Sequence, residues 1–453
     1  MKKITFFILC YALCAACGNG TPNGTDNQRP PDRPFYDAAF TNVPAPSDVV
    51  MYEANERVFA ATASLNAIAR RLDDLKALGV NVLWLMPINE QGTLNAIGSP
   101  YCVKDYTKVE PEYGTLDDLR KLVKQAHSRD MAVIIDWVAN HTAWDNEWIQ
   151  NKSWYTQDAQ GRIVSPEGTG WNDVADLDYA HPEMREAMIE AMKYWIYEAN
   201  IDGFRCDAAD MIPADFWKQA IDELRQFEGR TLLMLAEGAR TDHYTAGFDM
   251  DYGWDFYDKI KKVYNGQAAI ANLYASHENE YAHIPAGKEK LRFITNHDES
   301  AWDATPIALF GGEQGSLSAF VLTVALGGSP LLYSTQETGV ATTVPFFTPT
   351  AINWNMNPEL LAEYKKIMAV YSASEALRRG RLQTFDADDV ACFYRLYETH
   401  GALVAVNVRN RAVSFSVPAQ FVGQSFTNAF DNTAAALPAT VTMEPYQYTI
   451  WIK

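Results

Sequence analysis

Residues 201–210 read I-D-G-F-R-C-D-A-A-D, a short apolar stretch that carries an arginine and a carboxylate at its end. Side chains alternate along a strand, so Phe204 and Cys206 should point one way while Arg205 and Asp207 share the opposite face. A guanidinium on that face would hold the carboxylate ionised and oriented, as a nucleophile requires. An isolated pair of this kind is usually a structural ion pair, so its meaning depends on the rest of the chain.

Strands and helices alternate on both sides of this stretch. The pattern predicts strands at residues 48–52, 80–86, 131–138, 203–207, 231–237, 248–251, 291–295 and 330–335. It predicts helices at residues 65–78, 116–128, 182–200, 215–227, 313–326 and 358–371. The strands are nearly continuous apolar runs, as expected of parallel strands covered on both faces, and the helices have one apolar face. These units indicate an α/β fold, a (β/α)8 TIM barrel with its site at the carboxyl ends of the strands.

Two segments interrupt the alternation. Residues 141–178, rich in Trp, Gly and Asp, are far longer than a normal connection after the third strand, and we expect a short inserted lobe there. Helices disappear after residue 380, and alternating segments predict a C-terminal antiparallel β-sandwich. These segments are residues 390–397, 402–408, 413–417 and 446–452. The expected domains are therefore a barrel at 47–380, with its lobe at about 141–178, and a sandwich at 381–453.

The first 46 residues precede the predicted barrel. Residues 1–16 combine a basic start, a short apolar core and small residues before a cut, which is the pattern of a signal peptide. The sequence L-C-A-A-C ending at Cys17 resembles a bacterial lipobox, after which the cysteine would be lipidated, although Cys14 fits imperfectly. Residues 17–46 then form a flexible tether. We expect an exported lipoprotein, anchored in the cell envelope only through that lipid, and ordinary secretion is the alternative.

Composition restricts the classes of ligand. Apolar residues make up 48% of the 453 residues and charged residues 21%, so the chain can bury a large core. The formal net charge of −19 argues against nucleic acid as a partner and favours a neutral or cationic ligand. Aromatic residues reach 12%, and flat rings beyond the needs of packing suit sugar faces. The cysteine spacing indicates neither a disulfide framework nor a metal-binding motif.

Polar and charged residues cluster at the ends of four predicted strands. They are Asp136, Asn140 and His141; Arg205 and Asp207; Glu237; and Asn296, His297 and Asp298. A carboxylate next to an apolar run costs desolvation, so its repetition at one rim is poorly explained by stability alone. An ionised carboxylate, a protonated carboxylic acid and further charge together are the requirements of glycoside hydrolysis.

With these four motifs in this order, the chain from about residue 48 to its end resembles the alpha-amylase family of glycoside hydrolases. The resemblance implies a retaining enzyme that acts on α-glucans such as starch, glycogen or maltooligosaccharides. It implies that Asp207 is the nucleophile, Glu237 the general acid and base, and Asp298 the third carboxylate, which grips sugar hydroxyls.

The same resemblance implies a set of substrate-binding residues. Arg205, His141 and His297 match residues that line the sugar site. In the segment S-P-Y-C-V-K-D-Y, Tyr101 matches the ring that stacks on the sugar at the cleavage point, and Asp105 would lie beside it.

Calcium is the one cofactor that the resemblance implies. Asn140 matches a calcium ligand of many members, and Asp176, in A-D-L-D, matches another in the inserted lobe. Oxygen ligands suit calcium, but Asn140 could equally be a structural hydrogen-bonding residue.

The chain departs from the family pattern just after the nucleophile. Many members carry Lys-His there, which reaches the sugar beyond the cleaved bond, and this chain has Asp210 and Met211. The departure leaves a transglycosylase or isomerase open, because water and an acceptor sugar compete for the same intermediate. A non-catalytic starch-binding protein is the alternative from another class, and it would require a lost carboxylate.

Overall fold

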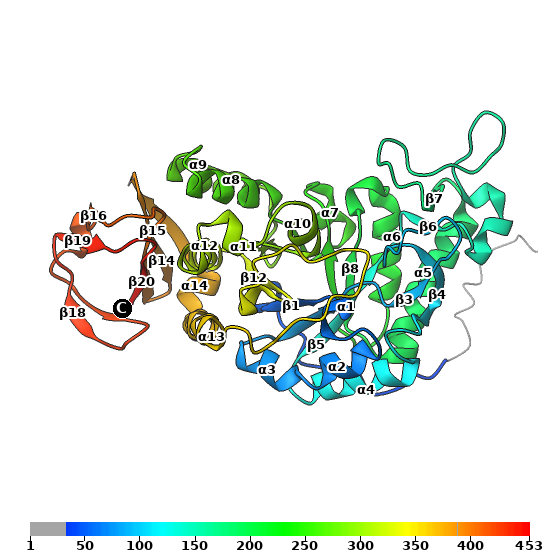
Figure 1. The fold of residues 1–453 in the computed structure, drawn as a ribbon, viewed down its shortest axis with the longest axis horizontal. Coiled ribbons are helices and arrows are strands. Elements are labelled where there is room, and N and C mark those ends of the chain that lie inside the picture. The colour runs from blue at the N-terminus through cyan, green and yellow to red at the C-terminus, as the bar shows by residue number, and fades with distance from the viewer. Residues whose placement is uncertain (1–32, 387) are drawn as a thin grey trace, which may run out of the picture. The chain divides into compact units, whose positions relative to one another are not determined.

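The computed structural model describes residues 33–386 and 388–453. Within this part of the chain, eight parallel strands close into a barrel in the order β1-β12-β11-β10-β9-β8-β5-β2. Figure 1 labels β1, β5, β8 and β12 among these strands. The barrel strands are β1 (Met51–Ala54), β2 (Val82–Leu85), β5 (Ala132–Trp137), β8 (Gly203–Cys206), β9 (Leu233–Ala236), β10 (Met250–Tyr252), β11 (Glu289–Arg292) and β12 (Ser329–Tyr333). The predicted (β/α)8 barrel is confirmed, including the strand near residue 250.

Helices follow the barrel strands along the chain. They are α1 (Glu56–Phe59), α2 (Ser64–Ala69), α3 (Leu72–Ala77), α4 (Leu116–His127), α5 (Pro182–Ala199), α6 (Ala214–Leu224), α7 (Asp242–Ala246), α8 (Trp254–Tyr264), α9 (Ile270–Tyr281), α10 (His297–Trp302), α11 (Pro306–Leu309), α12 (Glu313–Leu326), α13 (Pro358–Ala373) and α14 (Glu375–Arg379). Short 3-10 helices lie at Pro46–Asp48, Glu147–Gln150, Lys152–Trp154, Ala209–Met211, Gln336–Thr338 and Ala419–Phe421.

The prediction of one continuous helix at residues 65–78 is wrong. The apolar periodicity at residues 65–78 predicts a single helix, but the structure has α2 and α3 with a break at Arg71, whose ψ of 3° is not helical. The Arg71 guanidinium lies over the Trp354 ring, 4.4 Å from its centroid, and pairs with Asp74. A tertiary contact at the break accompanies the local departure from helical geometry.

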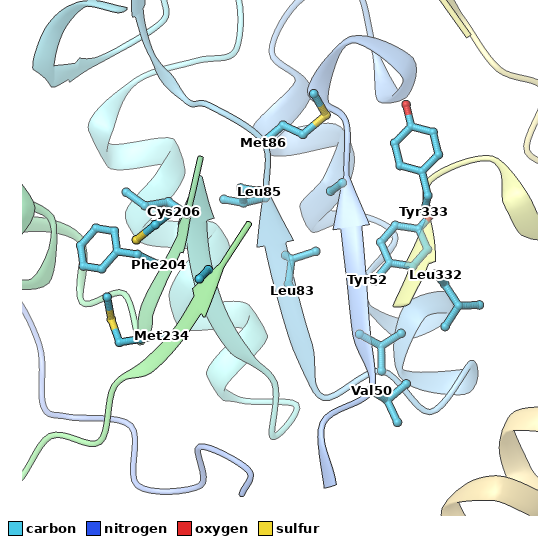
Figure 2. Close-up of a cluster of buried hydrophobic side chains, with 14 of the residues drawn as sticks. Val50, Tyr52, Leu83, Leu85, Met86, Phe204, Cys206, Met234, Leu332 and Tyr333 are labelled. Carbon is cyan, nitrogen blue, oxygen red and sulfur yellow. The ribbon is translucent and has the colours of Figure 1, made fainter. Parts of the chain in front are cut away.

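Alternation along the strands separates two cores. Val82, Trp84 and Leu235 belong to a cluster inside the barrel, whereas Leu83 and Leu85 belong to the larger cluster that packs under the helices. Figure 2 shows residues of that larger cluster, including Phe204 and Cys206 on one strand. Arg205 lies between them in sequence and takes the opposite side of β8, as predicted.

Two small antiparallel sheets lie outside the barrel sheet. Strands β3 (Asn89–Gln91) and β4 (Val103–Val109) pair after β2, and β6 (His141–Ala143) pairs with β7 (Val174–Asp176). The β6–β7 pairing joins the two ends of the segment predicted as an inserted lobe.

The C-terminal region is antiparallel, as predicted. A six-stranded sheet has the order β13-β14-β15-β20-β17-β18, and β16 pairs with β19 in a second sheet. Their bounds are β13 (Arg381–Phe385), β14 (Val390–Tyr397), β15 (His400–Asn407), β16 (Val413–Ser416), β17 (Ser425–Asn428), β18 (Ala434–Ala436), β19 (Thr440–Met443) and β20 (Tyr448–Ile452). A separate apolar cluster that includes Leu403, Phe415 and Phe426 fills the space between the sheets.

The N-terminal expectations lie mostly outside the described residues. The signal peptide, Cys17 and most of the tether belong to residues 1–32. In the part of the chain that is described, no helix is both long and apolar enough to cross a membrane.

Candidate active site

A cavity of about 420 Å³ opens at the carboxyl ends of the barrel strands. Asp207 follows β8 directly, Glu237 follows β9, and Asp298 lies in the first turn of α10, just after β11. All three line the cavity, with Ile97, Ser99, Tyr101, His141, Trp171, Asp173, Val174, Ala208, His297, Trp302, Phe346 and Phe347. The structure therefore brings together the three carboxylates that the sequence singles out.

Arg205 links the carboxylates from within the barrel, where its side chain is fully buried. One terminal nitrogen donates to Asp136 Oδ1 at 2.8 Å and to Asp207 Oδ1 at 2.9 Å. The other lies 2.9 Å from Glu237 Oε1 as an ion pair. Because Asp207 and Glu237 contact one guanidinium, their carboxylates face the same small volume.

Burial dominates the acidity of this pair. It raises the pKa of Asp207 to about 6 and the pKa of Glu237 to about 7, while Arg205 opposes both rises. The sequence predicts that Arg205 holds Asp207 ionised and oriented. The guanidinium contacts Asp207 and lowers its pKa, but desolvation has the larger effect, so the pKa lies above the ordinary value of 3.8. Of the two carboxyls, Asp207 has the lower pKa, as a nucleophile beside a general acid requires.

The backbone after Asp207 is unusual. Ala208 has φ 44° and ψ 40°, a left-handed conformation that a residue with a Cβ seldom adopts. In this conformation its N–H donates to Glu237 Oε2 at 2.7 Å. Such strain persists where surrounding structure imposes it, and it is concentrated at functional sites.

Tyr101 and His297 join the same network. The Tyr101 hydroxyl lies 2.9 Å from Asp136 Oδ2 and 2.7 Å from His297 Nε2. His297 Nδ1 in turn contacts the buried Glu53 carboxylate. Burial alone lowers the pKa of His297, but the carboxylates of Asp298 and Glu53 raise it to about 9, so the ring is cationic at neutral pH.

Glu53 is a further residue of this network, and it is not among the residues predicted from the sequence. It lies in β1, in the segment M-Y-E-A, and its side chain is fully buried. A charged residue within an apolar barrel strand is the same signal that identifies Asp207 and Glu237, so the pattern could have revealed it.

The inserted lobe supplies one wall of the cavity. His141, in β6, has its Nε2 atom 3.2 Å from the Tyr101 carbonyl oxygen, and its ring contacts Trp171 edge to face. Burial lowers the pKa of His141 to about 4, so this ring is neutral at pH 7 and can exchange hydrogen bonds with a sugar hydroxyl.

Asp105 is not brought to the cavity. It lies in β4, where its carboxylate accepts from Thr107 and pairs with Lys108 at 2.9 Å. Asp105 is absent from the residues that line the cavity, and these contacts hold its carboxylate at β4. The structure therefore does not bring Asp105 to the candidate substrate cavity together with Tyr101.

The predicted calcium ligands lie close together but form a sparse set. The backbone carbonyl of Asn140 accepts from the N–H of Leu177, the neighbour of Asp176, and burial raises the pKa of the Asp176 carboxyl. Across residues 33–386 and 388–453, no group of three or more acidic, histidine or cysteine side chains could hold a metal. A calcium ion here would need backbone carbonyls and water as its remaining ligands.

Three further rings that line the cavity carry no signal in the sequence pattern. Trp302 ends α10, and Phe346 and Phe347 lie in the long segment between β12 and α13. That segment has no helical or strand periodicity, so only the fold brings these rings to Tyr101.

Comparison with known proteins agrees with the geometry. A sequence model described as "Alpha amylase, catalytic domain" matches residues 34–162 and 169–393. Alpha-amylase MalA of Haloarcula japonica is 26% identical over 445 residues, which cover 93% of this chain and 63% of that protein. Alpha-amylase 3 of Dictyoglomus thermophilum is 26% identical over 348 residues, which cover 67% of this chain and 66% of that protein. The chain thus spans a little less than two thirds of the length of each.

A solved structure extends the likeness to three dimensions. The crystal structure of an alpha-amylase from Lactobacillus plantarum matches with a TM-score of 0.82 at 25% identity, covering 90% of this chain and 99% of that one.

Proposed function

The chain belongs to the alpha-amylase family of glycoside hydrolases, and on that premise we propose that it hydrolyses α-glucosidic bonds, mainly α-1,4, with retention of configuration. The proposed substrates are starch, glycogen or maltooligosaccharides. The observation that carries the proposal is the contact of both Asp207 and Glu237 with the Arg205 guanidinium at the rim of one cavity.

In the first step, an Asp207 oxygen attacks the anomeric carbon of the bound sugar. The bond from that carbon to the glycosidic oxygen breaks, and the oxygen takes its electron pair together with a proton from Glu237. The raised pKa of Glu237 supports this role, because a buried carboxylic acid keeps its proton near neutral pH.

In the second step, Glu237 accepts a proton from water as the water oxygen attacks the anomeric carbon. The bond to Asp207 breaks and the carboxylate is restored, so two inversions give net retention. The Ala208 N–H and Arg205 hold Glu237 in place for both transfers. Asp298 and the cationic His297 would contact sugar hydroxyls at the same centre.

A second candidate is a glucan transglycosylase or isomerase with the same intermediate. The Asp210 carboxylate accepts from the backbone N–H groups of Ala239 and Arg240 and lies 3.2 Å from His243 Nε2. The Asp210 side chain is therefore bound to the loop after β9. Its chemistry differs from that of the Lys-His pair that many family members carry on the leaving-group side. A non-catalytic role is not favoured, since all three carboxylates are present.

Product stereochemistry and two isosteric variants test the mechanism. NMR of the first product should show the α-anomer, and Asp207→Asn and Glu237→Gln should each lower turnover by about 100-fold or more. Only Glu237→Gln should regain rate on a glucoside whose leaving group needs no protonation. Glu337→Gln is the control, because Glu337 is a buried carboxylate that accepts from the Tyr52 hydroxyl outside the cavity. Initial β-anomer, or a near-normal rate for Asp207→Asn, would refute the assignment.

We also propose that the chain is exported and held at the cell envelope by a lipid on Cys17, and that calcium binds near Asn140 and Asp176. Neither feature takes part in the catalytic steps above. The basis of the first is the sequence of residues 1–46, and that of the second is the backbone hydrogen bond from Leu177 to Asn140, which brings the two segments together.

A further inference from the structure

The segment after β8 and the segment after β9 contact each other beside the candidate catalytic carboxylates. The Ala208 N–H donates to Glu237 Oε2 at 2.7 Å, and the Ala209 N–H donates to the Glu237 carbonyl oxygen at 3.0 Å. Glu237 is therefore bound through both its side chain and its backbone to the residues that follow β8. The position of its carboxyl depends on how residues 208–212 lie against residues 237–240.

The Asp210 carboxylate holds these two segments together. Its Oδ2 atom accepts from the Ala239 N–H at 3.1 Å, and its Oδ1 atom accepts from the Arg240 N–H at 3.3 Å. Oδ1 also lies 3.2 Å from Nε2 of His243, whose side chain is fully buried. An ionised carboxylate has enough lone pairs to accept from all three groups at once. One side chain thus fixes the backbone that comes directly after Glu237.

Arg240 makes the reciprocal contacts. One terminal nitrogen of its guanidinium donates to the backbone carbonyl oxygens of Asp210 at 2.9 Å and Ile212 at 3.0 Å. The other nitrogens donate to the two carboxylate oxygens of Asp242, at 2.7 and 3.0 Å. A bidentate pair of this kind restricts the orientation of the guanidinium. Asp210 and Arg240, with these contacts, are here called the interloop clasp.

Gly238 leaves the room that the interloop clasp requires. A Cβ at this position would lie 2.3 Å from Asp210 Oδ1 and 2.6 Å from a ring carbon of His243. Any larger residue would therefore displace the carboxylate from the backbone N–H groups that it binds.

Asp210 also stands where many members of the family carry a lysine. An ammonium group has only donors, so it could not accept from the N–H groups of Ala239 and Arg240. The carboxylate at position 210 and the sequence E-G-A-R at residues 237–240 are thus complementary in this chain.

We propose that Asp210 is a positioning residue for Glu237: it holds the backbone after the general acid so that the carboxyl meets the glycosidic oxygen, and Arg240 reinforces this hold. Asp210 is absent from the residues that line the cavity, so it acts through Glu237 rather than on the sugar at the cleaved bond. The proposal rests on the proposed function and adds a residue on which proton donation to the leaving group depends.

Two substrates distinguish positioning from a general loss of structure. Maltoheptaose has a leaving group that needs a proton from Glu237, whereas the fluoride of α-maltosyl fluoride leaves without one. Asp210→Ala should lower kcat/KM on maltoheptaose by about 10- to 100-fold, as for a small misplacement of a reacting group, and on the fluoride by less than about threefold. Asp210→Asn should fall between Asp210→Ala and the wild type, because its amide oxygen can still accept from one N–H.

Asp215→Asn is the control. Asp215 lies in α6, after the same barrel strand, and its exposed carboxylate pairs with Arg185 at 2.7 Å. That variant should change neither rate by more than about twofold, since exposed ion pairs contribute little. Equal losses on both substrates in the Asp210 variants, or no loss on maltoheptaose, would overturn the inference and leave the proposed function intact. Cleavage of neither substrate by the wild type would overturn both.

Arg240→Ala approaches the interloop clasp from the other segment. It removes the bonds to the carbonyl oxygens of Asp210 and Ile212 and leaves the backbone N–H groups that Asp210 binds. The same selective loss on maltoheptaose should appear, and the double variant with Asp210→Ala should lose less than the product of the two single effects, because the residues share contacts. Single effects that simply multiply would overturn the joint action of Asp210 and Arg240.

Discussion

The Glu53→Gln substitution offers a sharp test of the electrostatics inferred for this cavity. The change keeps the shape of the side chain and an oxygen that can accept from His297 Nδ1, but it removes a buried negative charge. The pKa of His297 rises from 6.5 to about 9 in the folded protein, which corresponds to about 3 kcal/mol in favour of the charged ring. Asp298 and Glu53 supply that rise against the opposing effect of burial.

Removing the Glu53 charge should therefore lower the pKa of His297 by about 1 to 2 pH units. The imidazole resonances in an NMR titration measure this value directly. With a weaker charge on His297, its contacts with Tyr101 and Asp298 loosen, and kcat/KM should fall about 10- to 100-fold, as for a small misplacement of a binding group.

Glu337→Gln provides the comparison for this experiment. Glu337 is also buried, and its carboxylate accepts from the Tyr52 hydroxyl at 2.8 Å rather than from His297. That variant should leave the pKa of His297 unchanged. If Glu53→Gln changed it by less than about half a pH unit, the assignment of His297 as a cation held by Glu53 would be wrong.

Three further predictions concern pH, calcium and the N-terminus. Because burial raises the pKa of Asp207 to about 6 and of Glu237 to about 7, kcat/KM should rise with pH through about 6 and fall through about 7, and both values belong to the coupled pair. A profile that stays flat from about pH 5 to about pH 8 contradicts this. A chelator should lower the thermal midpoint if calcium binds near Asn140 and Asp176, and an unchanged midpoint with no metal by elemental analysis rejects that site. The native protein should partition with membranes and Cys17→Ala should not, whereas a soluble wild type would count against lipidation.

The candidate catalytic residues were accessible from sequence because their signal is local. A carboxylate at the end of an apolar run, as at Asp207 and Glu237, carries a desolvation cost that requires an explanation. Parallel strands in a barrel end at one rim, so residues far apart in the chain could be placed together before their distances were known. Glu53 carries the same signal within a shorter run.

Pairwise geometry could not be obtained in this way. The balance between burial and Arg205 that sets the pKa of Asp207 depends on how much water the closed barrel excludes, which no sequence pattern encodes. The position of Asp105 is a related case, since its pairing with Lys108 and its place outside the cavity lining appear only in the folded chain.

The sequence by itself determined the barrel, the antiparallel C-terminal region and the carboxylates at the strand ends, because hydrophobic periodicity and buried charge are properties of neighbouring residues. The tertiary structure decided which rings line the cavity. Phe346 and Phe347 lie more than 240 residues from Tyr101 and Gly98 along the chain, in a segment without periodicity. Their positions depend on the closure of the barrel, which brings β12 beside β1. They also depend on Arg57, whose guanidinium donates to the carbonyl oxygens of Gly98 and Phe346.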